Sequence, residues 1–284
     1  MKVLVIGASG MIGSTIFRVI AENKDWSIYG TIRSESAKQF FMPEIRENLL
    51  ANIDVINHDS LINVFGKVCP DVVINCAGLT KHITGSNDPV NAMPINALMP
   101  HRLAELCKLL NARLIHISTD CVYSGKKGNY LESETADSMD VYGQSKLLGE
   151  VDYPHAVTLR TSTIGHEFST KHGLLEWFLS QEGECNGFLR AIFSGLPTIV
   201  LAQIIRDIVI PNNDLRGLYH VAGQPISKYD LLKLIAEVYG KSIKIIKDEN
   251  FTIDRSLNSD KFKTATGYTP SAWPELIRLM HSYQ

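Results

Sequence analysis

Through its first two-thirds the chain alternates short apolar runs, rich in β-branched residues, with amphipathic stretches of helical pattern. This alternation is typical of βαβ units, in which helices join parallel strands. The runs are continuously apolar, which indicates strands buried on both faces. We therefore predict an α/β fold with a doubly wound parallel sheet. Strands are expected at residues 2–7, 27–32, 53–58, 71–78, 113–119 and 156–163. Helices are expected at residues 11–23, 60–68, 96–110 (interrupted by Pro100) and 141–151.

The alternation becomes looser after about Gly165. Helical patterns follow at residues 173–180, 198–210 and 227–240. One convincing strand, residues 217–223, lies between the last two of them. We expect residues 1–165 to form the main α/β domain, joined by the strand at 217–223. Residues 166–284 are expected to form mainly a smaller C-terminal lobe.

Charge, cysteine content and hydropathy exclude several classes of partner. With 28 basic and 30 acidic residues and no basic stripe, the chain is not expected to bind nucleic acid. No apolar run predicts a membrane span, so we expect a soluble protein that does not bind membranes. The five cysteines are far apart and form no Cys-x-x-Cys pair. This spacing argues against disulfides or a bound metal and favours a reducing, cytoplasmic location.

The sequence GASGMIG follows the first predicted strand and leads into the first predicted helix. Its three glycines lack side chains, so the backbone can approach a pyrophosphate at the positive end of the helix. A tight turn between strand and helix would also require glycine, but the position at the start of a βαβ series favours a dinucleotide site. We assign this motif to cofactor binding through Gly7, Gly10, Met11, Ile12 and Gly13.

The residues after the second predicted strand bear on the choice of cofactor. An acidic residue there would bind the ribose hydroxyls of NAD, but the sequence has Arg33 and Ser34, which suit the 2′-phosphate of NADPH. We favour NADPH, although a solvated Arg33 in a loop is the simpler alternative and leaves NADH open. Asp59 follows the third predicted strand. It either accepts a hydrogen bond from the adenine amino group or forms a turn.

Two further strand ends lie at the sheet edge where α/β proteins bind ligands. The fourth predicted strand ends in Cys76, Ala77 and Gly78, of which the last two are small enough for the chain to pass beneath a cofactor. The fifth ends in Thr119 and Asp120. Their hydroxyl and carboxylate could contact a substrate, while Asp120 could equally cap the following turn.

The pattern Tyr-x-x-x-Lys occurs three times, and on a helix it places a phenol and an ammonium on one face. The match at 123–127 contains a glycine in a loop and is not expected to be helical. The match at 229–233 is expected on the surface of a remote helix. Tyr142 and Lys146 remain, and they follow the fifth strand after a connection of about twenty residues, which is long enough to be functional.

The motifs Gly-x-x-Gly-x-x-Gly, Asn-x-Ala-Gly, Ser-Thr-Asp and Tyr-x-x-x-Lys, in this order, resemble those of the extended short-chain dehydrogenase/reductase family. The segments LIHISTDCVYSG, VYGQSKLLGE, GLYHVAG and DRSLNSDKF closely resemble its dTDP-4-dehydrorhamnose reductases, a nucleotide-sugar 4-ketoreductase branch. The resemblance covers nearly the whole chain. It implies that residues 1–165 form an NAD(P)-binding Rossmann domain and that residues 166–284 form mainly a substrate-binding lobe.

The resemblance also implies roles for individual residues. Tyr142 would be the general acid, Lys146 its activator and a ligand of the cofactor ribose, and Thr119 a hydrogen-bond donor to the substrate carbonyl. This agrees with the chemistry, because hydride delivered to a ketone makes an alkoxide that needs a proton. Arg255 and Asn258 lie in a segment similar to the one that meets the substrate's nucleotide diphosphate. A surface arginine in a turn is the alternative for Arg255.

By this resemblance the protein is expected to reduce a 4-keto-6-deoxy nucleotide sugar with NADPH, in the synthesis of cell-surface polysaccharide precursors. Two alternatives remain. A nucleotide-sugar epimerase or dehydratase would retain NAD⁺ through its cycle. A non-catalytic NADP-binding regulatory subunit, similar to the β subunit of methionine adenosyltransferase, would bind the cofactor without turnover. A homodimer is compatible with the sequence.

Overall fold

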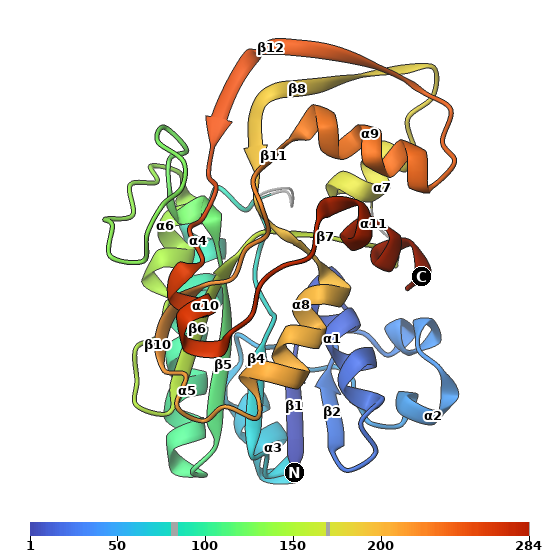
Figure 1. The fold of residues 1–284 in the computed structure, drawn as a ribbon. Coiled ribbons are helices and arrows are strands. Elements are labelled where there is room, and N and C mark those ends of the chain that lie inside the picture. The colour runs from blue at the N-terminus through green and yellow to red at the C-terminus, as the bar shows by residue number, and fades with distance from the viewer. Residues whose placement is uncertain (81–84, 169–170, 284) are drawn as a thin grey trace. The chain divides into compact units, whose positions relative to one another are not determined.

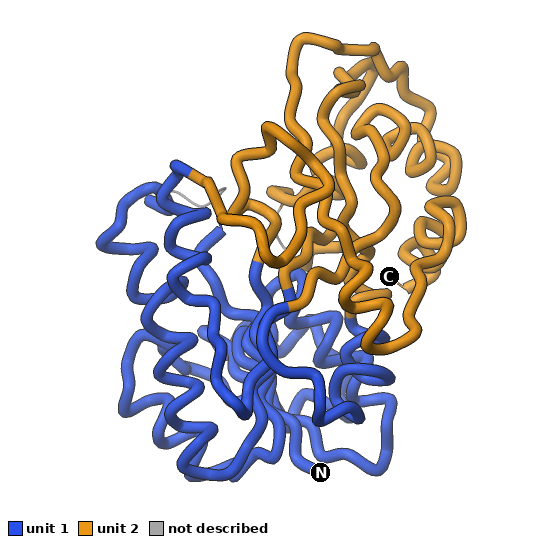
Figure 2. Tube along the Cα trace, turned by 60° about the vertical axis from the view of Figure 1, so that its left-hand side comes forward, with its two compact units in different colours: residues 1–118, 139–159, 202–218 blue, residues 119–138, 160–201, 219–284 orange. Residues whose placement is uncertain are grey.

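The structure is a computed structural model that describes residues 1–80, 85–168 and 171–283. Contacts between α-carbons divide the chain into two compact units (Figure 2). The first unit comprises residues 1–118, 139–159 and 202–218, and the second comprises residues 119–138, 160–201 and 219–284. Within the described ranges, every helix is too short or too polar to cross a membrane.

Seven strands form the main sheet (Figure 1), in the order β10-β6-β5-β4-β1-β2-β3. β1 is parallel to both β2 and β4, β2 is parallel to β3, and β4 is parallel to β5. The chain therefore winds outward from β1 in both directions, which confirms the predicted doubly wound sheet. The strands are β1 (Lys2–Ile6), β2 (Ser27–Thr31), β3 (Leu49–Leu50), β4 (Val72–Asn75), β5 (Arg113–Thr119), β6 (Ala156–Thr161) and β10 (Gly217–His220).

Helices pack on both faces of this sheet. They include α1 (Met11–Ala21), α3 (His58–Val68), α5 (Met99–Leu109) and α6 (Val141–Leu148). Side chains of α3 and α5 form one buried apolar cluster with Leu4 and Ile6 of β1. Val5 points to the other face, as does its register partner Gly30 on β2. A Cβ on Gly30 would lie 3.0 Å from the ring of Phe17 in α1, so the glycine allows α1 to pack closely.

The strand predicted at residues 53–58 is wrong. β3 is only Leu49–Leu50, and the residues that follow form turns leading into α3. Apolar side chains at positions 53 and 55 do pack against the core. However, Asp54 and Asn57 accept hydrogen bonds from backbone N–H groups two and three residues later, at 3.0 and 3.1 Å. Short polar side chains of this kind compete with strand pairing, and Asn57 becomes the N-cap of α3.

The interruption predicted at Pro100 is a change of helix type and not a break in the helical backbone. Helical backbone continues from α4 (Pro89–Ala92) through the π-helix η2 (Met93–Leu98) into α5. Pro100 lies in the first turn of α5, directly after η2. Proline has no N–H group to donate within a helix. Because Pro100 lies next to the change from π-helical to α-helical hydrogen bonding, the helix continues past it.

The C-terminal part of the chain contains more strand than the sequence predicted. β8 (Glu184–Phe193) and β12 (Lys244–Asp254) are parallel, and the short β11 (Ile226–Ser227) pairs with β8 in the antiparallel sense. Most side chains of β12 are exposed or half-buried. The alternation of apolar and polar residues that would predict a strand is therefore weak in β12. A register shift between Asp248 and Thr252 disturbs this alternation further.

The helices predicted in the second half are confirmed. The pattern at 227–240 is α9 (Lys228–Val238), which begins after its cap Ser227 and ends before Gly240, whose φ is 63°. The patterns at 173–180 and 198–210 are α7 (Leu174–Leu179) and α8 with η4 (Thr198–Ile204, Ile205–Val209). The remaining elements are η1 (Glu35–Phe40), α2 (Pro43–Arg46), η3 (Asp120–Val122), β7 (Thr163–Ile164), β9 (Leu196–Pro197), α10 (Asp260–Thr266) and α11 (Trp273–Ser282).

Candidate active site

The glycine-rich turn between β1 and α1 is shaped by contacts that exclude side chains. Gly7 has a φ of 81°, and a Cβ there would lie 3.0 Å from the backbone N and Cα of Ala77. A Cβ on Gly13 would lie 2.1 Å from the Gly7 carbonyl oxygen. Gly10 has an ordinary φ of −77° and no tight contact, so it leaves open space before the helix. No side chain caps α1, and its first-turn N–H groups, which include those of Met11 and Ile12, suit an anion.

Thr31, at the end of β2, holds this turn in place. Its Oγ1 accepts a hydrogen bond from the Gly7 N–H at 3.0 Å, and its carbonyl oxygen accepts one from the Ala8 N–H at 2.8 Å. Thr31 is buried, and only its place at the carboxyl end of β2 could have identified it from the sequence.

The residues predicted to select the cofactor are all exposed. Arg33 and Ser34 follow β2, and Ser34 Oγ caps η1 by accepting from the Ser36 N–H at 3.3 Å. Asp59 was predicted at a strand end, but it lies in the first turn of α3. The correction follows from the turn at 53–57, which moves the helix start to His58.

The loop after β4 is held by a buried pair that the sequence did not indicate. Asn75 Oδ1 accepts from the Ala77 N–H at 3.1 Å, and Asn75 Nδ2 donates to His116 Nδ1 on β5 at 3.0 Å. Both side chains are fully buried. Burial, followed by the charge of Lys146, holds the pKa of His116 well below its usual value, so His116 is the neutral acceptor. These hydrogen bonds therefore fix the backbone conformation of residues Cys76–Gly78.

Asn96 of η2 fixes the next part of the same loop. Its Oδ1 accepts from the Leu79 N–H at 2.8 Å, and its Nδ2 donates to the Leu79 carbonyl and to Ser145 Oγ of α6, both at 3.0 Å. A Cβ on Gly78 would lie 3.3 Å from Asn96 Oδ1 and 4.0 Å from Lys146 Nζ. Asn96 thus joins the loop that carries Gly78 to the helix that carries Lys146.

Tyr142 and Lys146 lie one turn apart on α6, as predicted. Asp140 is the N-cap of this helix, and its Oδ1 accepts from the Gly143 N–H at 2.6 Å. Tyr142 is half-buried. Lys146 is 6% exposed, and its Nζ donates to the Ile117 carbonyl of β5 at 2.7 Å. Burial lowers the pKa of Lys146 to about 8, while the negative charge of Glu150 acts in the opposite direction.

Cys76 and Glu150 complete the surroundings of Lys146 in the first unit. Burial raises the pKa of the Cys76 thiol to about 12, with Lys146 opposing the shift, so the thiol is neutral at physiological pH. Glu150 Oε1 accepts from Ser118 Oγ at 2.7 Å, and Ser118 follows Ile117 in β5. The structure therefore brings together Cys76, Gly78, Lys146 and the unpredicted Glu150.

Thr119 and Asp120 belong to the second unit, at the end of β5. Thr119 is 8% exposed, and its Oγ1 accepts from the Cys121 N–H at 3.1 Å and donates to Asp120 Oδ1 at 3.2 Å. Thr119 therefore caps the short helix η3, a role that the sequence suggested for its neighbour Asp120. Asp120 is half-buried, with its carboxylate next to the Thr119 hydroxyl.

Arg255 and Asn258 lie in the second unit after β12. Arg255 Nε donates to the Tyr123 carbonyl at 2.8 Å, and its Nη1 donates to Cys121 Sγ at 3.7 Å. Asn258 Oδ1 accepts from the Asp260 N–H at 2.9 Å. Both residues are half-buried and hydrogen-bonded to neighbouring chain.

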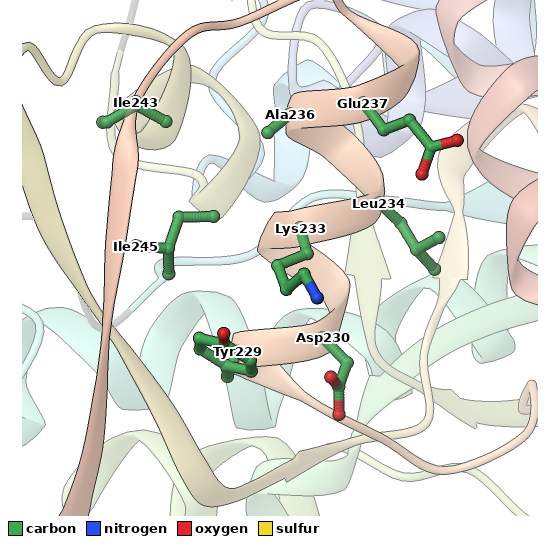
Figure 3. Close-up of a pocket in the computed structure, with 8 residues that line it drawn as sticks. All are labelled: Tyr229, Asp230, Lys233, Leu234, Ala236, Glu237, Ile243 and Ile245. Atoms are coloured by element: carbon green, nitrogen blue, oxygen red, sulfur yellow. The ribbon is translucent and has the colours of Figure 1, made fainter.

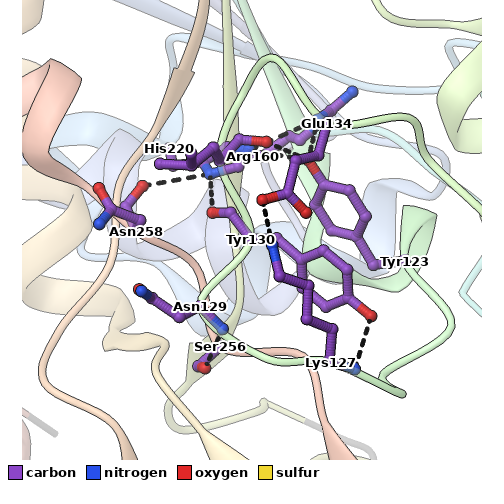
Figure 4. Close-up of polar contacts among 10 residues, drawn as sticks. Tyr123, Lys127, Asn129, Tyr130, Glu134, Arg160, His220, Ser256 and Asn258 are labelled. Atoms are coloured by element: carbon purple, nitrogen blue, oxygen red, sulfur yellow. Dashed lines mark hydrogen bonds and ion pairs between the residues drawn. The ribbon is translucent and has the colours of Figure 1, made fainter.

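Tyr123, from the match at 123–127, is part of a buried network in the second unit (Figure 4), whereas Lys127 is exposed. The Tyr123 ring stacks on Tyr130 at a centroid distance of 4.1 Å, and its hydroxyl accepts from Arg160 Nη1 at 2.7 Å. His220 Nδ1 faces the carbonyl oxygens of Tyr130 and Asn258 at 3.1 and 3.2 Å, so this nitrogen carries the hydrogen. Burial and then Arg160 lower the pKa of His220 to about 3. The network anchors residues 119–138 to the segment that contains Asn258.

The match at 229–233 lies in an open groove of about 570 Å³ in the second unit (Figure 3). Lys233 Nζ lies 5.7 Å from the centroid of the Tyr229 ring, and Lys247 Nζ lies 5.6 Å from it. These ammonium groups contact the ring by cation–π interaction. The groove is lined by Tyr229, Asp230, Lys233, Leu234, Ala236, Glu237, Ile243 and Ile245.

Metal ligands are not grouped in the described part of the chain, where no cluster of three or more His, Cys, Asp or Glu side chains could hold an ion. His166 contacts Glu176 Oε1 and the Tyr239 hydroxyl, both at 2.9 Å.

The parallel sheet, the glycine-rich turn and the Tyr-x-x-x-Lys helix define the class: this is a Rossmann-fold protein of the extended short-chain dehydrogenase/reductase type. The family model "RmlD substrate binding domain" matches residues 1–282, and the chain belongs to this family.

Individual relatives agree with this assignment. The chain is 24% identical to a dTDP-4-dehydrorhamnose reductase of Aggregatibacter actinomycetemcomitans, over 99% of each protein. It is 31% identical to the "Probable low-salt glycan biosynthesis reductase Agl14" of Haloferax volcanii, over 87% of this chain and 83% of that protein. The fold superposes with a TM-score of 0.81 on a dTDP-4-dehydrorhamnose reductase of Bacillus anthracis solved in complex with NADP, at 20% identity over 100% of this chain and 99% of the other.

Proposed function

We propose that this protein is an NADPH-dependent reductase of a nucleotide-linked 4-keto-6-deoxy sugar, acting in the synthesis of cell-surface polysaccharide precursors. The observation that carries the proposal is the buried Lys146, one turn from Tyr142 and next to the loop at Gly78, in a chain matched by the RmlD family over residues 1–282. The reductases of known name among its relatives support the same reaction class.

The residues present fit a dinucleotide. The turn containing Gly7, Gly10 and Gly13 leaves backbone N–H groups for a pyrophosphate, and Ala77 in the loop after β4 lies against this turn. Met11 and Ile12 begin the helix, Arg33 and Ser34 bind the 2′-phosphate, and Asp59 binds the adenine. When bound, NADPH would supply the hydride for the ketone carbon.

Tyr142 donates the proton that the new alkoxide requires, and Lys146 makes this easier. A free phenol has a pKa near 10, so bringing it about three units toward neutrality requires about 4 kcal/mol of differential stabilisation. A lysine ammonium one turn away favours the phenolate, and the same ammonium can bind the cofactor ribose. Burial increases the effect, because there is little water to screen the charge.

The second unit binds the sugar nucleotide. Thr119 contacts the substrate carbonyl, Asp120 orients the sugar hydroxyls, and Arg255 and Asn258 meet the diphosphate. Support comes from Arg255, whose Nε and Nη1 are held by Tyr123 and Cys121. A guanidinium fixed in this way loses little entropy when it binds phosphate oxygens.

The protein is a cytoplasmic homodimer in this proposal. Val90, Leu98 and Leu148 are exposed apolar side chains on α4, η2 and α6, which contact one another in the first unit. A second copy packed on these helices would bury them. Light scattering on the wild type and on Leu98→Glu tests the assignment, and a monomeric wild type would contradict it.

Purified protein, NADPH and a panel of dTDP-, UDP- and GDP-linked 4-keto sugars test the activity through loss of nicotinamide absorbance. Oxidation of NADPH with one linked sugar supports the reductase. Binding of NADPH without turnover of any sugar would favour a regulatory subunit, and tightly retained NAD⁺ would favour an epimerase or dehydratase. In the same assay Arg255→Ala should lower kcat/KM for the linked sugar and leave the free sugar unchanged, because only the linked sugar has a diphosphate. Equal effects on both would refute the role of Arg255.

A further inference from the structure

Lys146 is charged in a place that disfavours charge. Its ammonium is almost fully buried and donates to the Ile117 carbonyl at 2.7 Å. Burial moves the pKa of Lys146 from its ordinary 10.5 to about 8. The proposed mechanism needs the ammonium, because a neutral amine would not favour the phenolate of Tyr142. The molecule therefore needs a source of negative charge near Lys146.

Three titratable groups near Lys146 do not supply that charge. Cys76, after β4, is a neutral thiol, since burial raises its pKa to about 12. His116 on β5 is a neutral imidazole, since burial and Lys146 hold its pKa well below its usual value. Tyr142, on α6 itself, is the proton donor of the proposed reaction. The carboxylate of Glu150 opposes the effect of burial and raises the pKa of Lys146.

Glu150 is held in place at the end of α6. A Cβ on Gly149 would lie 1.9 Å from the Asn96 carbonyl oxygen, so only glycine lets the chain pass η2 there. The Glu150 N–H then donates to the Leu147 carbonyl at 3.1 Å, and Glu150 Oε1 accepts from Ser118 Oγ at 2.7 Å.

The ammonium of Lys146 and the carboxylate of Glu150 are consequently both hydrogen-bonded to adjacent residues of β5. The Ile117 carbonyl takes the ammonium of Lys146, and the hydroxyl of the next residue, Ser118, takes the carboxylate of Glu150. The carboxylate cannot turn freely to solvent while that hydrogen bond is made. Its field acts on Lys146 through a protein interior in which charge interactions are screened less than in water.

We propose that Glu150, oriented by Ser118, is a positioning residue that keeps Lys146 protonated at neutral pH. This inference rests on the proposed function, because it assigns Glu150 to the site of Tyr142 and Lys146. Glu150 contacts neither substrate nor cofactor in this scheme and acts through Lys146.

The pH dependence of kcat/KM tests the proposal. Glu150→Gln keeps an oxygen that can accept from Ser118 but removes the charge, so the loss of activity at basic pH should begin about one pH unit lower than in the wild type. Glu150→Asp keeps the charge and should shift the profile less. Glu105→Gln removes an exposed carboxylate from α5 and is the matched control. A Glu150→Gln profile equal to that of Glu105→Gln would overturn the proposal.

A second readout uses the protein without cofactor or substrate. The folded pKa of Lys146 lies below its unfolded value, so this group raises stability as pH increases from the folded to the unfolded pKa. In Glu150→Gln the folded pKa is lower still, so the rise should begin at lower pH. The urea midpoint should therefore increase more between about pH 6 and about pH 8 in Glu150→Gln than in Glu105→Gln.

The two readouts separate failure of this inference from failure of the proposed function. If Tyr142→Phe abolishes ketosugar reduction while Glu150→Gln changes neither the pH profile nor the pH dependence of the midpoint, Glu150 has no such role and the reductase assignment stands. If no ketosugar is reduced by the wild type but the midpoint responds as expected, the coupling of Glu150 to Lys146 stands and the reductase assignment is wrong.

Discussion

Lys146→Met is expected to remove activity without destabilising the protein. The pKa of Lys146 falls from 10.5 to about 8 on folding, which at pH 7 corresponds to about 3 kcal/mol of lost stability, at about 1.4 kcal/mol per unit. Methionine has no charge to bury and similar length, so this penalty disappears. The variant also loses the hydrogen bond from Nζ to the Ile117 carbonyl, worth about 1.5–3 kcal/mol for a charged donor. The net change at pH 7 is a gain of zero to about 2 kcal/mol.

The pH dependence of this difference gives a further check. Above its folded pKa, Lys146 loses its charge in the native state, so its penalty decreases and the wild type gains stability relative to the variant. With the pKa at about 8, the advantage of Lys146→Met should decrease by about 1 kcal/mol between pH 7 and pH 9.

Urea unfolding at both pH values measures these quantities, and NADPH oxidation with a ketosugar measures activity. Lys233→Met is the matched control, because Lys233 is the exposed lysine of another Tyr-x-x-x-Lys match and lies over the ring of Tyr229. It should change stability by about 1 kcal/mol at most and leave turnover unaltered. A loss of more than about 2 kcal/mol in Lys146→Met at pH 7 would refute the reasoning, since Lys146 would then be a net stabilising residue.

Three further predictions follow from the same site. Tyr142→Phe should lower kcat by about 10²-fold or more with little change in NADPH affinity, because only the proton donor is lost, whereas Tyr229→Phe should change little; equal losses would mean that the wrong pair was chosen. Arg33→Ala should weaken NADPH about 10- to 100-fold in a fluorescence titration and leave NADH binding unchanged, because only NADPH has the 2′-phosphate, and equal changes for both cofactors would make Arg33 an ordinary surface charge. Gly13→Ala should abolish NADPH binding, since its Cβ would lie 2.1 Å from a backbone carbonyl oxygen. Gly66→Ala in α3 should bind NADPH normally, because no atom lies within 4 Å of the added Cβ. Tight NADPH binding by Gly13→Ala would show that the turn can move to accept a side chain.

Local sequence pattern was sufficient for the frame of the first unit. Buried parallel strands are continuously apolar, so β1, β2, β4, β5 and β6 could be placed from the sequence. The glycines at Gly7 and Gly13 could also be identified, because their backbone geometry excludes any side chain. The spacing of Tyr142 and Lys146 places them on one face of a helix, and their position after the fifth strand distinguished them from the two other matches.

The two strands β8 and β12 could not be predicted in the same way. They pair over many residues, yet most of their side chains face solvent or are only half-buried. Their stability comes from pairing between segments about sixty residues apart, which leaves little apolar periodicity in either segment. The strand expected at 53–58 failed for a related reason, since local bonds from Asp54 and Asn57 replaced the pairing that its apolar residues suggested.

The sequence by itself determined the parallel sheet, the glycine-rich turn and the relative position of Tyr142 and Lys146, because each depends on neighbours within about four residues or on a repeated apolar pattern. Only the tertiary structure decided what surrounds Lys146. Asn75 meets His116 across 41 residues, and Ser118 meets Glu150 across 32. A buried polar side chain must find a partner wherever the fold supplies one, and its position in the sequence does not show which residue that will be.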